Sequence, residues 1–192
     1  AMYLADLTLP ENLVFKAETN AGRNYPCSTA LTKARGVVDA YRNGQGPGSI
    51  CTTAGAIGIS RSGATGIYDS QYKLNENDSK LRTIADGGIK EVGDAFKAFA
   101  CGAHCVMMGK LLAGTDEAPG QLKVDPVSGM QYKDYRGMGS AEANVHQIRG
   151  YGKLPQGVSG IVEYRGSVHK WIPLIKDGLL SAFEVQNCLN IS

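Results

Sequence analysis

The chain has 192 residues, 43% of them hydrophobic and 20% charged, a composition that fits one soluble globular domain with a substantial core. The formal net charge is only +2 and the basic residues are scattered, which argues against a nucleic-acid surface. No apolar run approaches the ~20 residues of a membrane span, and the first ten residues lack the pattern of a signal peptide. Five cysteines without framework spacing indicate reduced thiols and a cytoplasmic protein, and no second pair joins Cys101 and Cys105 to complete a zinc site.

The first half of the chain alternates short apolar segments with helical patterns. Residues 12–17 predict a short buried strand, and residues 29–41 predict a helix. Beyond a glycine-rich loop, residues 62–74 predict a second helix, and residues 82–86 predict a strand that ends in Asp86. Glycines recur at the ends of the apolar segments, where loops between strands and helices would lie.

The second half continues this alternation. Residues 91–100 predict a helix, and residues 103–109 are almost entirely apolar, as in a strand of a parallel sheet. The apolar face of that helix is expected to carry Val92, Phe96 and Phe99. Residues 167–183 predict a last helix, with Pro173 near its first turn. Strands that alternate with helices predict βα units and a parallel sheet, so the fold class is α/β.

The glycine-rich loop places one cysteine between hydroxyl-bearing residues. Its sequence is Gly46-Pro47-Gly48-Ser49-Ile50-Cys51-Thr52-Thr53. Glycines let the backbone approach an anion or a metal ion closely, because no Cβ is in the way. Ser49 can hydrogen-bond a phosphate, and Cys51 can serve as a covalent nucleophile. The alternative for Cys51 is a small buried structural cysteine.

Three further glycine-containing motifs follow in the chain. They are Ala85-Asp86-Gly87-Gly88-Ile89, Met107-Met108-Gly109 and Tyr135-Arg136-Gly137-Met138-Gly139-Ser140. Glycines after a strand and before a helix let backbone N–H groups face a phosphate. The four motifs in this order resemble the catalytic domain of the IMP dehydrogenase and GMP reductase family.

The resemblance implies a (β/α)8 TIM barrel, of which this chain matches roughly the C-terminal half. Such a barrel needs roughly 250 residues, and only about four βα units can be counted here. Two explanations stand: a part of a split or truncated enzyme, or the visible portions of a longer polypeptide. The open sheet edges of a half barrel favour the second. We expect residues 1–192 to form a single catalytic-barrel domain, with no CBS insertion.

The resemblance also implies a reaction. The sulfur of Cys51 would attack C2 of the purine of IMP, hydride would leave to NAD, and hydrolysis of the adduct would give XMP. Thr53 would assist beside the reacting carbon. In the reductase direction, GMP would lose ammonia and NADPH would return the hydride. The segment from Tyr135 to Gly160 favours the dehydrogenase.

Further residues match the family's substrate and cation sites. Asp86 would accept hydrogen bonds from both ribose hydroxyls, and Gln156 would read the N1 and O6 edge of the purine. The remaining substrate contacts would come from Ser49, Gly87, Gly88, Met108, Gly109, Lys110, Tyr135, Gly137, Met138 and Gly139. Backbone carbonyls of Gly46, Gly48 and Cys51 would hold potassium. Residues for the dinucleotide are not assigned.

The family resemblance implies a homotetramer that acts on a small nucleotide, without nucleic-acid or membrane partners. Two other readings stay open. One is a non-catalytic nucleotide-binding paralogue, since Ala54-Gly55 after Thr53 departs from the family pattern. The other is a barrel fragment that needs a partner chain to fold.

Overall fold

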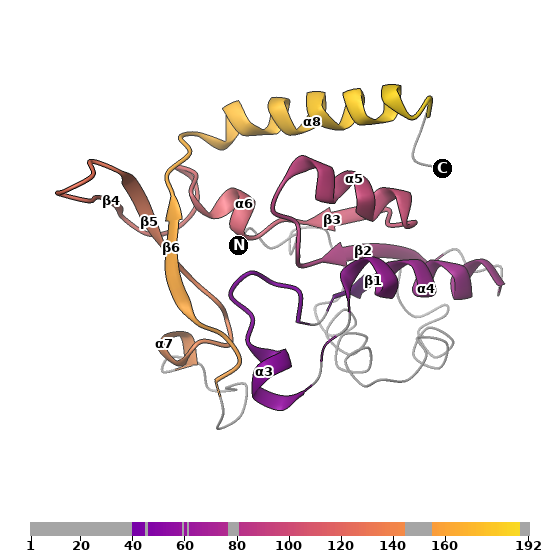
Figure 1. Ribbon diagram of the computed structural model, residues 1–192, viewed down its shortest axis with the longest axis horizontal. Helices are drawn as coiled ribbons and strands as arrows, with labels where there is room; N and C mark the ends of the chain where they lie inside the picture. The colour runs from indigo at the N-terminus through magenta and orange to yellow at the C-terminus, as the bar shows by residue number, and fades with distance from the viewer. Residues whose placement is uncertain are drawn as a thin grey trace.

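Two three-stranded sheets organise the part of the chain that the computed structural model describes (Figure 1). The described residues are 40–44, 46–58, 60, 62–76, 81–144 and 155–188. The expected strand at 12–17 lies outside them, as does most of the expected helix at 29–41. None of the helices in these stretches combines the length and apolar character that crossing a membrane requires.

The first sheet is parallel and has the order β1-β2-β3. Its strands are β1 (Ala40–Asn43), β2 (Arg82–Asp86) and β3 (Cys105–Met107). Asn43 pairs with Ala85, and Asp86 pairs with Met107. Because parallel strands end at the same edge of a sheet, the loops that follow β1, β2 and β3 lie close together.

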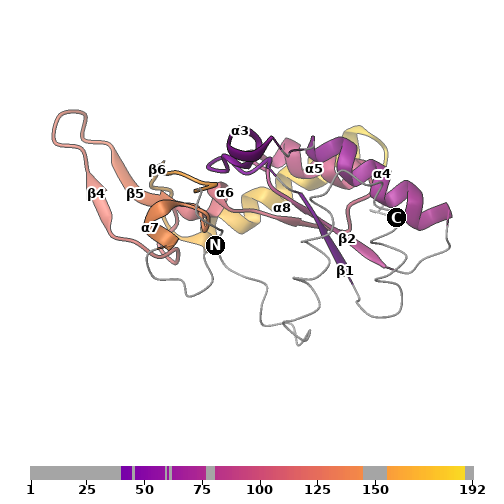
Figure 2. The same cartoon turned by 90° about the horizontal axis from the view of Figure 1, so that it is seen from below.

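Helices connect these strands, as the alternation in the sequence predicted. Helix α4 (Gly63–Glu76) lies between β1 and β2, and α5 (Val92–Ala100) lies between β2 and β3. Both lie on the same side of the sheet (Figure 2). The buried cluster beneath them consists of Ile67, Ala85, Ile89, Ala95, Ala98 and Ala103. The mixed α/β class with a parallel sheet is therefore confirmed.

The expected helix at 29–41 is wrong at its end, because Ala40 and Tyr41 belong to β1. Tyr41 has no exposed surface and pairs with Thr83 of β2, so its burial in the sheet overrides the helical pattern before it. The strand at 82–86 has the predicted bounds, whereas the strand at 103–109 is confined to Cys105–Met107.

The apolar residues of α5 contact two neighbours: Val92 and Phe96, two of the three predicted to share a face, meet the last helix, while Phe99 packs against the buried cluster. Ala95 and Ala98 are the residues buried toward the sheet. Phe96 instead meets Phe183 of α8 (Val168–Val185) edge-on, with 5.3 Å between ring centroids. Val92 lies against Gly178 of the same helix.

Helix α8 begins where Ser167 caps it. The Ser167 hydroxyl accepts from the backbone N–H of His169 at 3.2 Å and donates to Glu117 at 2.7 Å. Glu117 also accepts from the N–H of Val168. Pro173 lies in the second turn of α8 rather than near the first.

We expect Ser167→Ala to lower the free energy of unfolding by about 1 kcal/mol, because it removes this cap. Denaturant unfolding followed by circular dichroism measures the change. Ser181→Ala, in the same helix and away from the cap, is the matched control and should leave stability unchanged or slightly higher. Equal losses in both variants would contradict the capping role.

The second sheet is antiparallel and was not predicted. Strands β4 (Leu122–Val124), β5 (Gln131–Arg136) and β6 (Ser159–Glu163) form it in that order. The hairpin of β4 and β5 projects away from the parallel sheet (Figure 1). Its turn is closed by Asp125, which accepts from the N–H groups of Val127 and Ser128 at 2.8 Å.

A buried lysine joins β5 to the rest of the molecule. Lys133 is 3% exposed, and its ammonium donates to the carbonyls of Thr115 and Ala118. These carbonyls follow the short helix α6 (Lys110–Ala113), which itself follows β3. Two other short helices, α3 (Thr53–Ile57) and α7 (Ala141–Asn144), follow the cysteine loop and β5.

Candidate active site

The cysteine loop connects β1 to α3 and folds back on itself. The N–H of Cys51 donates to the carbonyl of Gly48 at 3.0 Å, which closes a turn around Ser49 and Ile50. The Cys51 thiol contacts the Thr53 hydroxyl at 3.1 Å. Thr53 is buried, so this hydroxyl is held beside the sulfur at the start of α3.

The loop after β2 packs directly against the cysteine loop. A Cβ placed on Gly87 would lie 2.8 Å from Cγ of Pro47 and 3.0 Å from the backbone nitrogen of Gly48. Gly87 and Gly88 also have φ values of +85° and +79°, which glycine adopts without strain. The two glycine motifs therefore pack directly against each other.

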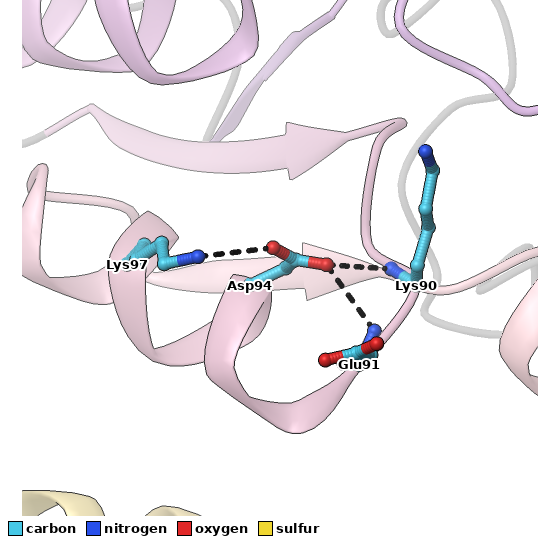
Figure 3. A network of polar contacts seen from close by, with 4 residues as sticks. All are labelled: Lys90, Glu91, Asp94 and Lys97. Carbon is cyan, nitrogen blue, oxygen red and sulfur yellow. Dashed lines mark hydrogen bonds and ion pairs between the residues drawn. The ribbon is translucent and has the colours of Figure 1, made fainter.

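A polar network begins the helix that follows this second loop (Figure 3). The Asp94 carboxylate accepts from the N–H groups of Lys90 and Glu91 at 3.1 and 3.2 Å, and Lys97 pairs with it at 3.4 Å. The bond from the Lys90 N–H, followed by that from Glu91, lowers the pKa of Asp94. This cap fixes the chain four residues after Asp86.

Asp86 lies at the carboxyl end of β2 and pairs with Arg42 of β1. The Arg42 Nε lies 3.1 Å from Oδ2 of Asp86. Burial raises the pKa of the Asp86 carboxyl above its ordinary value, and the charge of Arg42 and the N–H of Gly87 oppose that rise. The carboxylate is thus largely buried and held on one side by Arg42.

Gly44 lets the backbone after β1 touch the backbone of Asp86. A Cβ at this position would lie 1.7 Å from the Asp86 carbonyl oxygen, and φ is +145°. We expect Gly44→Ala to destabilise the fold by about 2–4 kcal/mol through overlap and backbone strain. Denaturant unfolding tests this expectation. Gly55→Ala is the control, because its Cβ would meet nothing within 4 Å; similar stability of the two variants would contradict the close approach.

Tyr135, at the end of β5, reaches the loops that follow the parallel strands. A Cβ on Gly109, which follows β3, would lie 2.9 Å from the Tyr135 hydroxyl oxygen. Burial raises the pKa of Tyr135, a hydrogen bond with Ser49 opposes the rise, and the charge of Asp86 adds to it. Ser49, Gly109 and Tyr135 therefore meet at one place, beside Asp86.

Gln156 connects the cysteine loop to the motif after β5. Its carbonyl accepts from the N–H of Thr52, and its N–H donates to the carbonyl of Gly139, both at 3.0 Å. Its side-chain Oε1 accepts from the Thr53 hydroxyl at 3.2 Å. The next residue, Gly157, bridges to Cys51 in antiparallel fashion.

Comparison with known proteins identifies the family of this chain. The IMP dehydrogenase / GMP reductase domain matches residues 25–192. The chain is 43% identical over 148 residues to an inosine-5'-monophosphate dehydrogenase of Thermoplasma acidophilum, covering 74% of this chain and 30% of the relative. It is 39% identical over 179 residues to the enzyme of the same name from Korarchaeum cryptofilum, covering 90% and 37%.

The chain belongs to the IMP dehydrogenase and GMP reductase family. This confirms the resemblance and assigns the chain to a family of oxidoreductases. A Bacillus subtilis relative with the inosine-5'-monophosphate dehydrogenase name is 39% identical over 150 residues. The chain spans about a third of the length of these curated relatives.

Four of the residues that the resemblance assigns to the substrate site are less central to the group of loops around Cys51, Asp86 and Tyr135. Met108 packs against the buried core cluster, and Lys110 is exposed at the start of α6. The side chain of Met138 is 42% exposed. Gly137 lies against Ile50, since a Cβ there would come within 3.3 Å of the Ile50 Cδ1.

Sequence reasoning missed two residues of this family site, Arg42 and Gly44. Arg42 belongs to β1 and Gly44 follows it, whereas the sequence pattern predicted a helix that ends at residue 41. The sequence does carry one signal: a charged residue shortly before a glycine at the end of both strands, Arg42 before Gly44 and Asp86 before Gly87. If β1 had been recognised, its pairing with β2 would have placed the Arg42 side chain near the Asp86 carboxylate.

The carbonyls expected to hold potassium in this family are partly engaged. The Gly48 carbonyl already accepts from the Cys51 N–H. Gly46 has φ +94°, and a Cβ there would lie 2.7 Å from the Ser60 hydroxyl. Within the described residues, no cluster of three or more His, Cys, Asp or Glu side chains could hold a metal ion. A carbonyl oxygen has a second lone pair, so this loop is compatible with a weakly bound cation.

Proposed function

We propose that this chain carries the nucleotide site of an IMP dehydrogenase, which oxidises IMP to XMP in purine nucleotide metabolism. One observation supports this most strongly. The Cys51 sulfur lies beside a buried hydroxyl, on a loop packed against the glycine turn that carries Asp86. A nucleophile, a diol acceptor and glycine turns for a phosphate are the groups this reaction needs.

The proposed reaction begins with Cys51. Its sulfur forms a bond to C2 of the purine, and the hydrogen on C2 leaves with its electron pair. NAD supplies the acceptor for that hydride. Water then attacks C2, the carbon–sulfur bond breaks, and XMP is released with the thiol regenerated. IMP and water thus give XMP, while one hydride is transferred and one proton is released.

The nucleotide is proposed to lie across the loops after the three parallel strands. Asp86 accepts from the ribose hydroxyls, and the phosphate lies among Ser49, Gly109 and Tyr135, where the hydroxyls of Ser49 and Tyr135 come together beside Gly109. Gly87 and Gly88 extend that phosphate site. The purine lies between Cys51 and Gln156, with Gly139 beside it.

We further propose that β1, β2 and β3 are consecutive strands of a (β/α)8 barrel. Three features support this architecture: the three strands are parallel, helices α4 and α5 lie on one side of their sheet, and the proposed site lies at the carboxyl ends of the strands. We also propose a cytoplasmic homotetramer that uses NAD as the hydride acceptor and holds potassium on the carbonyls of Gly46, Gly48 and Cys51; the resemblance to the family supports this proposal.

Absorbance of the nicotinamide at 340 nm tests the function. The full polypeptide is assayed in potassium buffer with IMP and NAD, and separately with GMP and NADPH. We expect a rise with IMP and NAD that depends on potassium. A fall with GMP and NADPH instead would establish the reductase. No turnover in either assay would contradict both reactions, and binding of IMP without turnover would establish the non-catalytic paralogue.

GMP reductase is the second candidate, because the same cysteine and ribose-binding carboxylate would serve it. The names of the relatives favour the dehydrogenase: the eight relatives compared at 37–43% identity all bear that name.

A further inference from the structure

Two side chains of β5 contact the chain on either side of the short helix α6. Lys133 and Tyr135 are two residues apart on a strand, so they point to the same face of the sheet. The Tyr135 hydroxyl lies beside Gly109, which precedes α6, since a Cβ there would come within 2.9 Å of its oxygen. The Lys133 ammonium donates to the carbonyls of Thr115 and Ala118, which follow α6. Strand β5 is therefore attached at both ends of α6.

The contact at Lys133 is buried and its acceptor is fixed in place. The exposed fractions of Lys133 and Thr115 are 3% and 2%. Thr115 is itself held from two sides, because its hydroxyl donates to the Leu112 carbonyl at 2.8 Å and its backbone bridges to Gly166. A hydrogen bond from a charged donor is stronger than a neutral one, and burial keeps water from competing for it. Lys133 therefore fixes the position of β5 relative to the chain after β3.

Tyr135 receives no side-chain support from the strand opposite it. Its partner on β6 is Gly160, which has no side chain. The pairing of β4 with β5 runs only from Gln131 to Lys133, so β4 ends before it reaches Tyr135. Cross-strand side-chain pairs are what normally holds a residue on a sheet. The place of the Tyr135 hydroxyl therefore depends on the position of β5, which Lys133 sets.

We propose that Lys133 is a positioning residue for Tyr135, and through it for recognition of the substrate phosphate. By holding β5 against the chain after α6, Lys133 places the Tyr135 hydroxyl beside Ser49 and Gly109. This inference rests on the phosphate site of the proposed function. A hydrogen bond weakens steeply outside its normal length and angle. Loss of the Lys133 ammonium should therefore reduce what the Tyr135 hydroxyl contributes to binding of the phosphate.

The test compares binding of IMP with binding of inosine, which lacks the phosphate. Lys133→Met keeps the apolar stem and removes the ammonium. We expect the affinity of the full polypeptide for IMP to fall about ten-fold, as loss of one hydrogen bond to a charged group would give, and that for inosine to stay nearly unchanged. Calorimetry measures IMP, and displacement of IMP measures inosine. Partial unfolding weakens both by the same factor, so the ratio of the two affinities reports on the phosphate.

Two further variants make the comparison specific to Lys133. Lys123→Met is the matched control, because Lys123 is on the same hairpin but is exposed and paired with Asp134. It should leave the ratio of affinities unchanged. Lys133→Gln keeps an amide that can still donate, and its ratio should lie between those of wild type and Lys133→Met. Where Lys133→Met does not fold, Lys133→Gln is judged by the same criterion.

Tyr135→Phe removes the hydroxyl through which Lys133 is proposed to act. In that background, Lys133→Met should no longer change the ratio of affinities. An unchanged ratio in the single variants of Lys133 would overturn the proposal. A loss that persists in Tyr135→Phe would also overturn it, because Lys133 would then act independently of Tyr135. Wild type that binds IMP no more tightly than inosine would contradict the phosphate site itself, so that failure is distinguishable from failure of the role of Lys133.

Discussion

Cys51→Ser is expected to lower turnover of IMP by about 10^4-fold or more, as loss of a nucleophile does in other covalent enzymes. The serine hydroxyl fills nearly the same space and can still contact Thr53. It is a far weaker nucleophile than a thiol, and no general base is in contact with it among the described side chains. Initial rates of NADH formation measure the loss, and calorimetry measures binding of IMP.

The expected result combines a large loss of rate with little change in affinity. Cys188→Ser is the matched control, because Cys188 is exposed after α8 and outside the cluster. It should retain full turnover. A Cys51→Ser variant that keeps more than a tenth of the rate would exclude the covalent route. Loss of IMP binding as well would indicate that the loop had collapsed, which unfolding measurements would reveal.

The parts of the site that the sequence predicted are those encoded locally. The strand at 82–86 and the helix at 62–74 each have a short, continuous pattern, and the structure has both. The glycine motifs were informative for a similar reason. Gly87 is required by its own positive φ and by the nearby Pro47, and such a requirement leaves a visible mark in the sequence.

The parts that were missed depend on contacts between distant segments. β1 has four residues, and its strand conformation follows from pairing with β2 some forty residues later. The antiparallel sheet was hidden because β5 reads as a polar segment. Its one fully buried residue is Lys133, which is satisfied by the carbonyls of Thr115 and Ala118. Local patterning does not reveal such a partner.

Asp86→Asn is expected to weaken binding of IMP by about 10^2-fold. An ionised carboxylate accepts from two ribose hydroxyls, and each hydrogen bond to a charged group is worth roughly 1.5–3 kcal/mol. An amide keeps one acceptor oxygen and presents a donor where the second hydroxyl must donate. Calorimetry gives the affinity at neutral pH. Asp94→Asn, on the exposed cap of α5, is the matched control and should leave the affinity nearly unchanged.

The pH dependence of binding separates this carboxylate from an exposed one. Burial raises the pKa of Asp86 above its ordinary value, and only the ionised form accepts both hydroxyls. Affinity should therefore fall as the pH decreases, from a higher pH than an exposed aspartate would give. Arg42 opposes the rise, so Arg42→Met should move the loss to still higher pH. The nucleotide phosphate also titrates near pH 6 and changes the affinity of wild type and Asp86→Asn alike. The difference in affinity between these two proteins at each pH therefore reports on Asp86 alone. A difference that does not change with pH, or a shift to lower pH in Arg42→Met, would show that Asp86 does not bind the ribose in its ionised form.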